Sequence, residues 1–126
     1  MRNTYKDQYN EKENTMTIKI SIKRKFKNAS AKNVSEVIYE FRQLAIKEKG
    51  YISSESLYGC KDPNLIVVLS MWEKMEDWER YVNSSARKEA EKKYSELFEK
   101  PTEFEAYHLG LPFTKSDHEF VEPLEF

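Results

Sequence analysis

The sequence predicts an α+β domain of the ferredoxin-like type, in which helices cover one face of a single antiparallel sheet. The chain has 126 residues, enough for one domain and too few for two ordinary ones. Its periodic segments follow the order β-α-β-β-α-β, which is the split βαβ arrangement. One of the strands, 65–72, is almost continuously apolar, so both of its faces need cover.

The composition is that of a globular domain with nearly balanced charge. Apolar residues make up 39% of the chain, charged residues 34%, and the formal net charge is −1. This balance gives no general attraction for nucleic acid, and we expect the basic residues within 19–27 to be a solvated strand and turn. The single cysteine, Cys60, excludes an internal disulfide, which suits a reducing compartment.

Residues 1–15 are expected to form a flexible, polar N-terminal arm outside the domain. After Met1 the first 14 residues include no aliphatic side chain. They lack the apolar stretch of a signal peptide, and no segment approaches the roughly 20 apolar residues of a membrane span. We therefore expect a cytoplasmic protein that binds neither membranes nor nucleic acid.

Residues 16–26 predict the first strand, because apolar and polar side chains alternate along them. The side expected to be buried carries three isoleucines: Ile18, Ile20 and Ile22. The opposite side carries Lys19, Ser21 and Lys23. This strand therefore has one half of its side chains in the core.

The following segment predicts an amphipathic helix that ends at Gly50. Its apolar residues recur at helical spacing: Val34, Val37, Ile38, Phe41, Leu44 and Ala45. Either Ser30 or Asn33 can cap its start, the latter as a capping-box variant with Glu36. Glycine is the usual residue just past a helix C-terminus.

Two strands follow, at 51–60 and 65–72, joined by a turn around Pro63. Residues 74–82 and 84–98 predict two helical segments, separated where a serine can cap the second. A last strand covers 104–109 and places three residues on one side: Phe104, Ala106 and His108.

Residues 110–126 form an irregular tail that is too apolar for a simple disordered segment. Its apolar residues are Leu111, Phe113, Phe120, Val121, Leu124 and Phe126. We expect this tail to dock on its own domain or on a partner subunit.

Alternation along strand 65–72 predicts an apolar patch on the open face of the sheet. If the helices cover Ile66, Val68, Ser70 and Trp72, four large side chains lie on the other face: Leu65, Val67, Leu69 and Met71. A second copy of the same sheet is the simplest cover, through a twofold contact, and the tail is the other candidate. Lys19 and Lys23 fall on the same face, so they lie at the rim of this contact or the facing is inverted.

The run from Leu65 to Tyr81 resembles the antibiotic biosynthesis monooxygenase (ABM) domain. That family has a strand ending in Trp-Glu, here Trp72 and Glu73, and an aromatic residue about six positions on, here Trp78. Gly50-Tyr51 resembles its glycine-aromatic opening of the second strand. The serine-containing break at 83–86 and the strand at 101–107 extend the resemblance over about residues 16–109. These motifs are mainly structural.

The resemblance implies a dimeric α+β barrel, with a pocket between helices and sheet in each subunit. Members include cofactor-independent oxygenases whose electron-rich phenolic or quinol substrates supply the electrons. It therefore implies a monooxygenase that needs no cofactor and acts on a small aromatic or quinol-type molecule. A non-catalytic dimeric module that binds a small apolar or aromatic ligand is the alternative.

Trp72 is the leading candidate for the chemistry, since a tryptophan at the matching position often lines the family's active site. Its indole offers an apolar wall and one N–H donor, and Ser70 shares its face. Trp78 and Tyr81, on the short helix, and Phe41, on the first helix, are further candidates for substrate binding. The alternative for all of these aromatic residues is a purely structural role in the core.

His108 is the candidate base, because histidine can accept a proton near neutral pH and this one shares a face with Phe104. Tyr58 is a second candidate for a hydrogen bond to a substrate hydroxyl. A lone histidine on a strand is more often structural or exposed, and that alternative stays open.

Haem and metal binding find little support in the sequence. The haem-degrading branch of the family carries a histidine on the helix after the Trp-Glu motif, and residues 86–94 contain none. Its first-strand asparagine also has no match within 17–25. Two histidines and one cysteine far apart in sequence form no metal-ligand spacing, so we expect no metal site.

Overall fold

The computed structural model describes residues 16–110, and seven helices and strands and one 3-10 turn follow one another in this part of the chain. Their bounds are β1 (Ile18–Lys25), α2 (Ala31–Ala45), β2 (Tyr51–Tyr58), β3 (Leu65–Trp72), α3 (Met75–Val82), α4 (Ser85–Tyr94), the 3-10 turn η1 (Ser95–Leu97) and β4 (Glu103–His108). The order is the predicted β-α-β-β-α-β, with the second helix broken in two. The predicted N-terminal arm, and the predicted tail beyond Gly110, lie outside the described residues.

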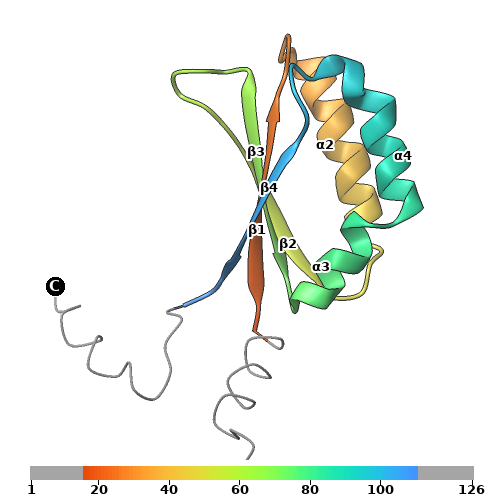
Figure 1. Cartoon of the computed structure of the whole chain (residues 1–126). Coiled ribbons are helices and arrows are strands. Elements are labelled where there is room, and N and C mark those ends of the chain that lie inside the picture. The colour runs from red at the N-terminus through yellow and green to blue at the C-terminus, as the bar shows by residue number, and fades with distance from the viewer. Residues whose placement is uncertain (1–15, 111–126) are drawn as a thin grey trace, which may run out of the picture.

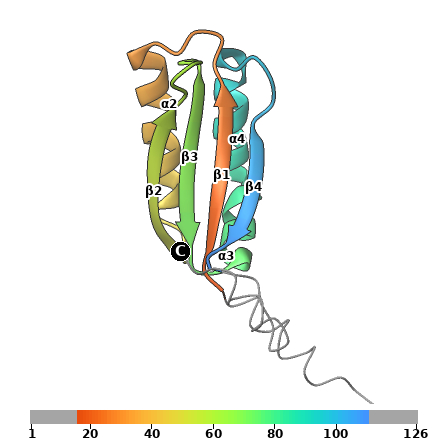
Figure 2. The same ribbon diagram turned by 90° about the vertical axis from the view of Figure 1, so that its left-hand side faces the viewer.

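The four strands form one antiparallel sheet in the order β2-β3-β1-β4. All three helices lie on one side of this sheet, as Figure 1 shows. Figure 2 looks onto the opposite face, where the four strands stand in front and the helices behind. The predicted ferredoxin-like α+β fold is therefore confirmed.

The pairing register assigns each strand residue to one of the two faces. Ile18 pairs with Trp72 and Ile20 with Ser70 across β1 and β3, so these four side chains share a face. All four are buried, at 0–4% exposed. The helices therefore cover the face that alternation in Leu65–Trp72 predicts.

The other face of the sheet carries the apolar residues of β3 together with the lysines of β1. Lys19 pairs with Met71 and Lys23 with Val67, so the lysines stand on the open face of a central strand. The sequence assigned the lysines and the apolar residues of β3 to the same open face, and the register confirms this assignment. Leu57 of β2 pairs with Val67 and is 46% exposed.

Gly50 sits at a close approach between the turn after α2 and helix α3. Helix α2 ends at Ala45, earlier than predicted, and residues 46–49 form a turn before Gly50, which has φ +90°. A Cβ at this position would overlap the buried carboxyl group of Asp77. Glycine is therefore required both by the backbone conformation and by the space.

Two serines cap the longer helices, as the sequence allows. The Ser30 hydroxyl accepts a hydrogen bond from the Asn33 N–H at 3.1 Å, so Ser30 rather than Asn33 caps α2. Ser84 caps α4 in the same way through the Arg87 N–H, at 3.3 Å. Helix α4 passes into η1 after Tyr94, short of the predicted end.

Candidate functional site

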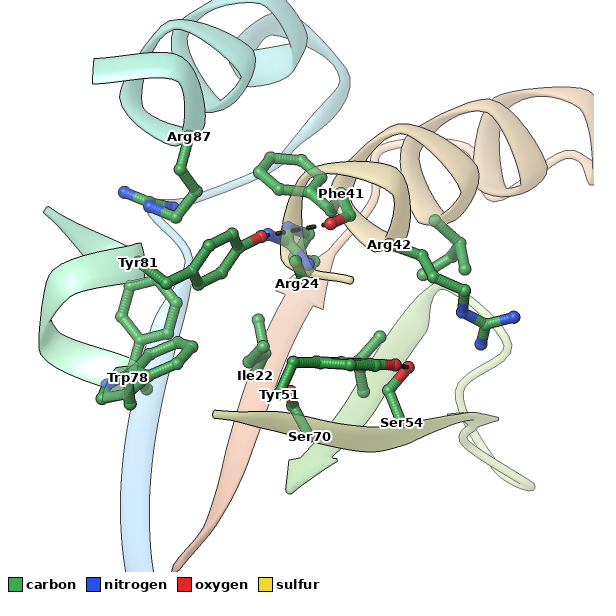
Figure 3. Close-up of a pocket in the computed structure, with 14 residues that line it drawn as sticks. Ile22, Arg24, Phe41, Arg42, Tyr51, Ser54, Ser70, Trp78, Tyr81 and Arg87 are labelled. Carbon is green, nitrogen blue, oxygen red and sulfur yellow. Dashed lines mark hydrogen bonds between the residues drawn. The ribbon is translucent and has the colours of Figure 1, made fainter. Parts of the chain in front are cut away.

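A cavity lies between the helices and the covered face of the sheet (Figure 3). Its volume of about 30 Å³ holds about two water molecules, so a ring-sized ligand requires lining side chains to move apart. Every helix and strand contributes to its 14 lining residues: Ile22, Arg24, Ile38, Phe41, Arg42, Ala45, Tyr51, Ser54, Val68, Ser70, Trp78, Tyr81, Arg87 and Phe104.

Aromatic rings form one wall of the cavity. The Trp78 ring meets Phe104 edge-on at 5.6 Å between centroids and lies 5.8 Å from the ring of Tyr81. The Tyr81 hydroxyl donates a hydrogen bond to the Phe41 carbonyl, at 3.2 Å. Burial raises the pKa of Tyr81 to about 12, so its phenol keeps its proton at neutral pH.

Hydroxyl groups provide the neutral polar contacts of the cavity. Tyr51 and Ser54 share a hydrogen bond of 2.8 Å between their side-chain oxygens. The Ser70 hydroxyl accepts the indole N–H of Trp72 at 2.8 Å, which leaves the Ser70 proton free to be donated. These hydroxyls can orient a bound ligand that carries its own hydroxyl groups.

Three arginines supply all of the charge among the described residues that line the cavity: Arg24, Arg42 and Arg87. Arg24 and Arg87 are 3% and 7% exposed, whereas Arg42 is exposed. The Arg24 guanidinium lies 4.2 Å from the centre of the Phe41 ring, a cation–π contact. Burial lowers the pKa of Arg24, because removal from water disfavours the charged form, although Glu91 opposes that effect.

Four of the residues predicted to form the site are brought together at this cavity: Phe41, Ser70, Trp78 and Tyr81. Trp72 stands directly behind them, fully buried, with its ring stacked on Tyr81 at 5.1 Å. It does not line the cavity itself, but it supports lining residues through this stacking and through its hydrogen bond to Ser70.

The remaining two predicted residues lie apart from the cavity lining. His108 ends β4, where it pairs with Ile18 and is exposed. Tyr58 ends the edge strand β2 and is 73% exposed. Neither is among the residues that line the cavity.

The sequence did not predict the arginines of the site, nor the hydroxyls of Tyr51 and Ser54. Arg24 lies among the basic residues of 19–27, which were expected to be solvated, but it continues the inward alternation of Ile18, Ile20 and Ile22. An arginine at an inward position of a strand, between outward lysines, was the available signal. Tyr51, Ser54 and Arg87 had no comparable signal.

Within residues 16–110 no group of three His, Cys, Asp or Glu side chains is arranged to hold a metal ion. None of the helices in the same range is long and apolar enough to cross a membrane.

Solved structures share this fold at low sequence identity. A conserved protein from Methanosarcina mazei Go1 matches with a TM-score of 0.60 and 21% identity, covering 76% of this chain and 95% of its own. A protein from Shewanella oneidensis matches with a TM-score of 0.64 and 16% identity, covering 75% and 92%. SnoaB from Streptomyces nogalater, a cofactor-independent oxygenase, matches with a TM-score of 0.66 and 9% identity, covering 76% and 95%.

The sequence comparisons settle the family. A search of the curated proteins found no match. The family model for antibiotic biosynthesis monooxygenases matches residues 17–93, which is more than half of the 126-residue chain. That range includes the elements from β1 to α4 except the last residue of α4, and the fold agrees with that of SnoaB. The chain therefore belongs to the antibiotic biosynthesis monooxygenase (ABM) family.

Proposed function

We propose that this protein is a cofactor-independent monooxygenase that acts on a small, electron-rich aromatic molecule of the hydroquinone type. The observation that carries the proposal is a cavity walled by aromatic rings, with a buried arginine, between the helices and sheet of an ABM-family fold. Its structural similarity to SnoaB, a cofactor-independent oxygenase, supports the reaction class. The small size of the cavity favours a single ring over a polycyclic substrate.

In the proposed reaction the substrate supplies all the electrons. Hydroquinone and O2 give hydroxybenzoquinone and water. One oxygen atom of O2 is added to a ring carbon as a hydroxyl group, the other is released as water, and the substrate loses four electrons. The phenolate form gives up electrons more readily than the phenol. A buried guanidinium such as Arg24 favours that anion, because an opposite charge nearby lowers the pKa of a bound phenol.

The remaining residues have positioning roles in this proposal. The ring of the substrate packs against Trp78 and Phe104. The hydroxyls of Ser54 and Ser70 orient the substrate oxygens. Trp72 acts through Ser70. The indole N–H of Trp72 donates a hydrogen bond to the Ser70 hydroxyl oxygen, and this bond orients the hydroxyl so that its own proton points toward the substrate. His108 and Tyr58 have no part in the site that we propose.

Oxygen uptake with a panel of hydroquinones, corrected for the uncatalysed reaction with heat-inactivated protein, tests the proposal. We expect uptake with a single-ring hydroquinone and one hydroxybenzoquinone per O2 consumed. Ser54→Ala is expected to lower kcat/KM by about tenfold, the value of one hydrogen bond to the substrate. Ser53→Ala is the matched control, since Ser53 pairs with Met71 and faces the open side of the sheet.

A folded protein that consumes no oxygen with any hydroquinone would reject the proposal. A loss of activity in Ser53→Ala as large as that in Ser54→Ala would place the reaction outside this cavity. Both variants change an exposed or half-buried serine, so neither threatens the fold.

One observation favours a second candidate function, a non-catalytic module that binds a small aromatic ligand. Among the described residues that line the cavity there is no Asp, Glu, His, Lys or Cys to act as a general base. Thermal stabilisation of the protein by a hydroquinone, without oxygen uptake, would select this alternative.

We also propose that two copies of the chain pair through the open faces of their sheets. The support is the row of half-buried apolar side chains that the helices leave uncovered along β3: Leu65, Val67, Leu69 and Met71. An apolar row of this kind is costly in water and suits a twofold contact, in which the same surface serves both subunits.

A further inference from the structure

The charge of the cavity exceeds what its neighbourhood compensates. The buried guanidinium groups of Arg24 and Arg87 share one carboxylate, that of Glu91. Its Oε1 lies 3.4 Å from Arg24 Nη2 and 3.1 Å from Arg87 Nη1, while its Oε2 accepts a hydrogen bond from Thr102 at 2.5 Å. One negative charge therefore faces two positive charges in a poorly solvated region, where an uncompensated charge is costly.

Arg24 also has donor capacity that the protein leaves unused. Its Nε–H is buried and has no hydrogen-bond partner among residues 16–110. Arg87, in contrast, uses its Nε–H to donate to the Val82 carbonyl at 2.8 Å. A buried N–H without a partner is uncommon in folded proteins. Arg24 lines the cavity, so a ligand that moves the side chains covering this N–H would give it an acceptor.

A basic groove adjoins the cavity on its outer side. It runs between α4, η1 and the start of β4, and shares Arg87 and Phe104 with the cavity. Lysines outnumber acids along it, with Lys88, Lys92 and Lys100 against Glu91. Lys100 is paired with Glu103 at 3.1 Å, and the other two lysines and Arg87 would attract an anion toward the cavity.

From these three observations we infer that the cavity is built for an aromatic acid: a single ring whose carboxylate binds between Arg24 and Arg87. The inference rests on the proposed function only in using the same cavity, and it concerns binding rather than turnover. A carboxylate accepts two parallel hydrogen bonds from a guanidinium, and such charge-assisted bonds are about twice as strong as neutral ones. The ligand would supply the second negative charge that Glu91 alone does not.

Calorimetric titration under nitrogen measures binding without allowing oxygenation. The probes are 2,5-dihydroxybenzoate and its methyl ester, which share a ring and hydroxyl groups but differ by one charge at pH 7. We expect the acid to bind the full-length protein at least tenfold more tightly than the ester. Equal affinities, or no binding of the acid, would overturn the inference.

Two variants assign the preference to the arginines. In Arg24→Gln we expect the acid and the ester to bind within about twofold of each other. Glu91→Gln removes the carboxylate that competes with the ligand, so it is expected to tighten binding of the acid at least threefold without changing that of the ester. Lys47→Gln is the control, since it removes one exposed positive charge outside the cavity.

Each result decides the inference separately from the proposed oxygenase activity. If Arg24→Gln fails to fold, Glu91→Gln decides, and unchanged affinity for the acid in that variant overturns the inference. A preference for the acid that survives in a folded Arg24→Gln also overturns it. Oxygen uptake with neutral hydroquinone but no preference for the acid rejects the inference alone. Preference for the acid without oxygen uptake rejects only the oxygenase.

Discussion

The two faces of the sheet are built by the same four strands and carry opposite kinds of chemistry. On the covered face two polar side chains at the centre of the sheet, Arg24 and Ser70, are almost fully buried and contact aromatic rings. On the open face charged residues such as Lys23 stand beside apolar ones, and all of them reach water. Because β1 contributes alternate residues to both faces, neighbours in the sequence have very different energetic roles.

The comparison shows where a polar residue carries functional information. A lysine on the open face costs little in the free subunit, since water solvates it. An arginine on the covered face must be compensated by partners or by a ligand. Arg24 is only one residue from Lys23 and Lys25, yet it is the one that lines the cavity.

The largest effect that we predict is on the covered face. Trp72→Ala should lower the free energy of unfolding by about 3–5 kcal/mol, since it removes the fully buried ring against which Tyr51, Trp78 and Tyr81 pack. Tyr58→Ala, at a site that is 73% exposed, should change it by less than about 0.5 kcal/mol. Urea unfolding followed by circular dichroism measures both, and similar losses would contradict the contrast.

On the open face the predicted effect is on association rather than folding. Leu69→Lys should weaken the proposed dimer by at least 100-fold, because each subunit would bury a lysine at the contact. Glu55 pairs with position 69 across β2 and β3, so the new lysine has a partner on the free subunit and the fold should hold. Sedimentation equilibrium measures the dissociation constant.

The control for this experiment introduces a lysine on helix α2, on the other side of the sheet. Tyr39 of α2 is 67% exposed, so Tyr39→Lys should leave the association unchanged. A wild-type chain that stays monomeric at all accessible concentrations would reject the proposed contact through the sheet.

The fold could be predicted from the sequence because it depends on periodicity. Alternation in 65–72 identified both faces of β3. Serines near the starts of two helices were possible caps, and the structure selects Ser30 over Asn33 for α2 and Ser84 for α4. The end of α2 at Ala45 was not predicted, and neither was the close approach of Gly50 to Asp77, a residue distant in the sequence. Periodicity reports on one element at a time, whereas contacts of this kind involve two.

The candidate site was less predictable than the fold. The family motif predicted that Trp72 lines the site, but its ring is fully buried behind the cavity lining and is hydrogen-bonded to Ser70. A sequence motif alone does not distinguish a residue of the cavity wall from a core residue directly beneath it. Arg87 faces the cavity because α4 packs across the sheet beside Phe104, which only the tertiary structure reveals. Family motifs and alternation predicted four residues that meet at the cavity, whereas the contacts of Arg87 depend on packing between elements that neither signal reports.

A smaller effect should appear in the alkaline stability of the covered face. The unfolded chain releases the Tyr81 proton near pH 10, whereas burial holds it in the folded protein until about pH 12. The unfolded state then binds fewer protons, so stability falls as the pH rises between these values, by up to about 1.4 kcal/mol per pH unit.

Tyr81→Phe removes this titration, so its free energy of unfolding should fall less steeply with rising pH than that of the wild type. Tyr58→Phe changes an exposed tyrosine, so its free energy of unfolding should fall with pH as steeply as that of the wild type. Unfolding in urea at pH 9, 10 and 11 compares the three proteins, and identical slopes for all of them would contradict the assignment.

The smallest predicted effect tests how far the contact between open faces extends. Lys23 Nζ and Glu105 Oε1 are 3.7 Å apart, and their side chains are 44% and 57% exposed in the single subunit. A double-mutant cycle with Lys23→Met and Glu105→Gln, made in the Leu69→Lys background, should give a coupling below about 1 kcal/mol, the usual value for an exposed pair. The same cycle made in the wild-type chain, at a fixed concentration, should give a larger coupling, because in the proposed dimer a partner sheet over β1 and β4 would exclude water from the pair.

Equal couplings in the wild-type and Leu69→Lys chains would restrict the contact between sheets to β2 and β3, where the apolar side chains lie. The charged half of the open face would then stay in solvent.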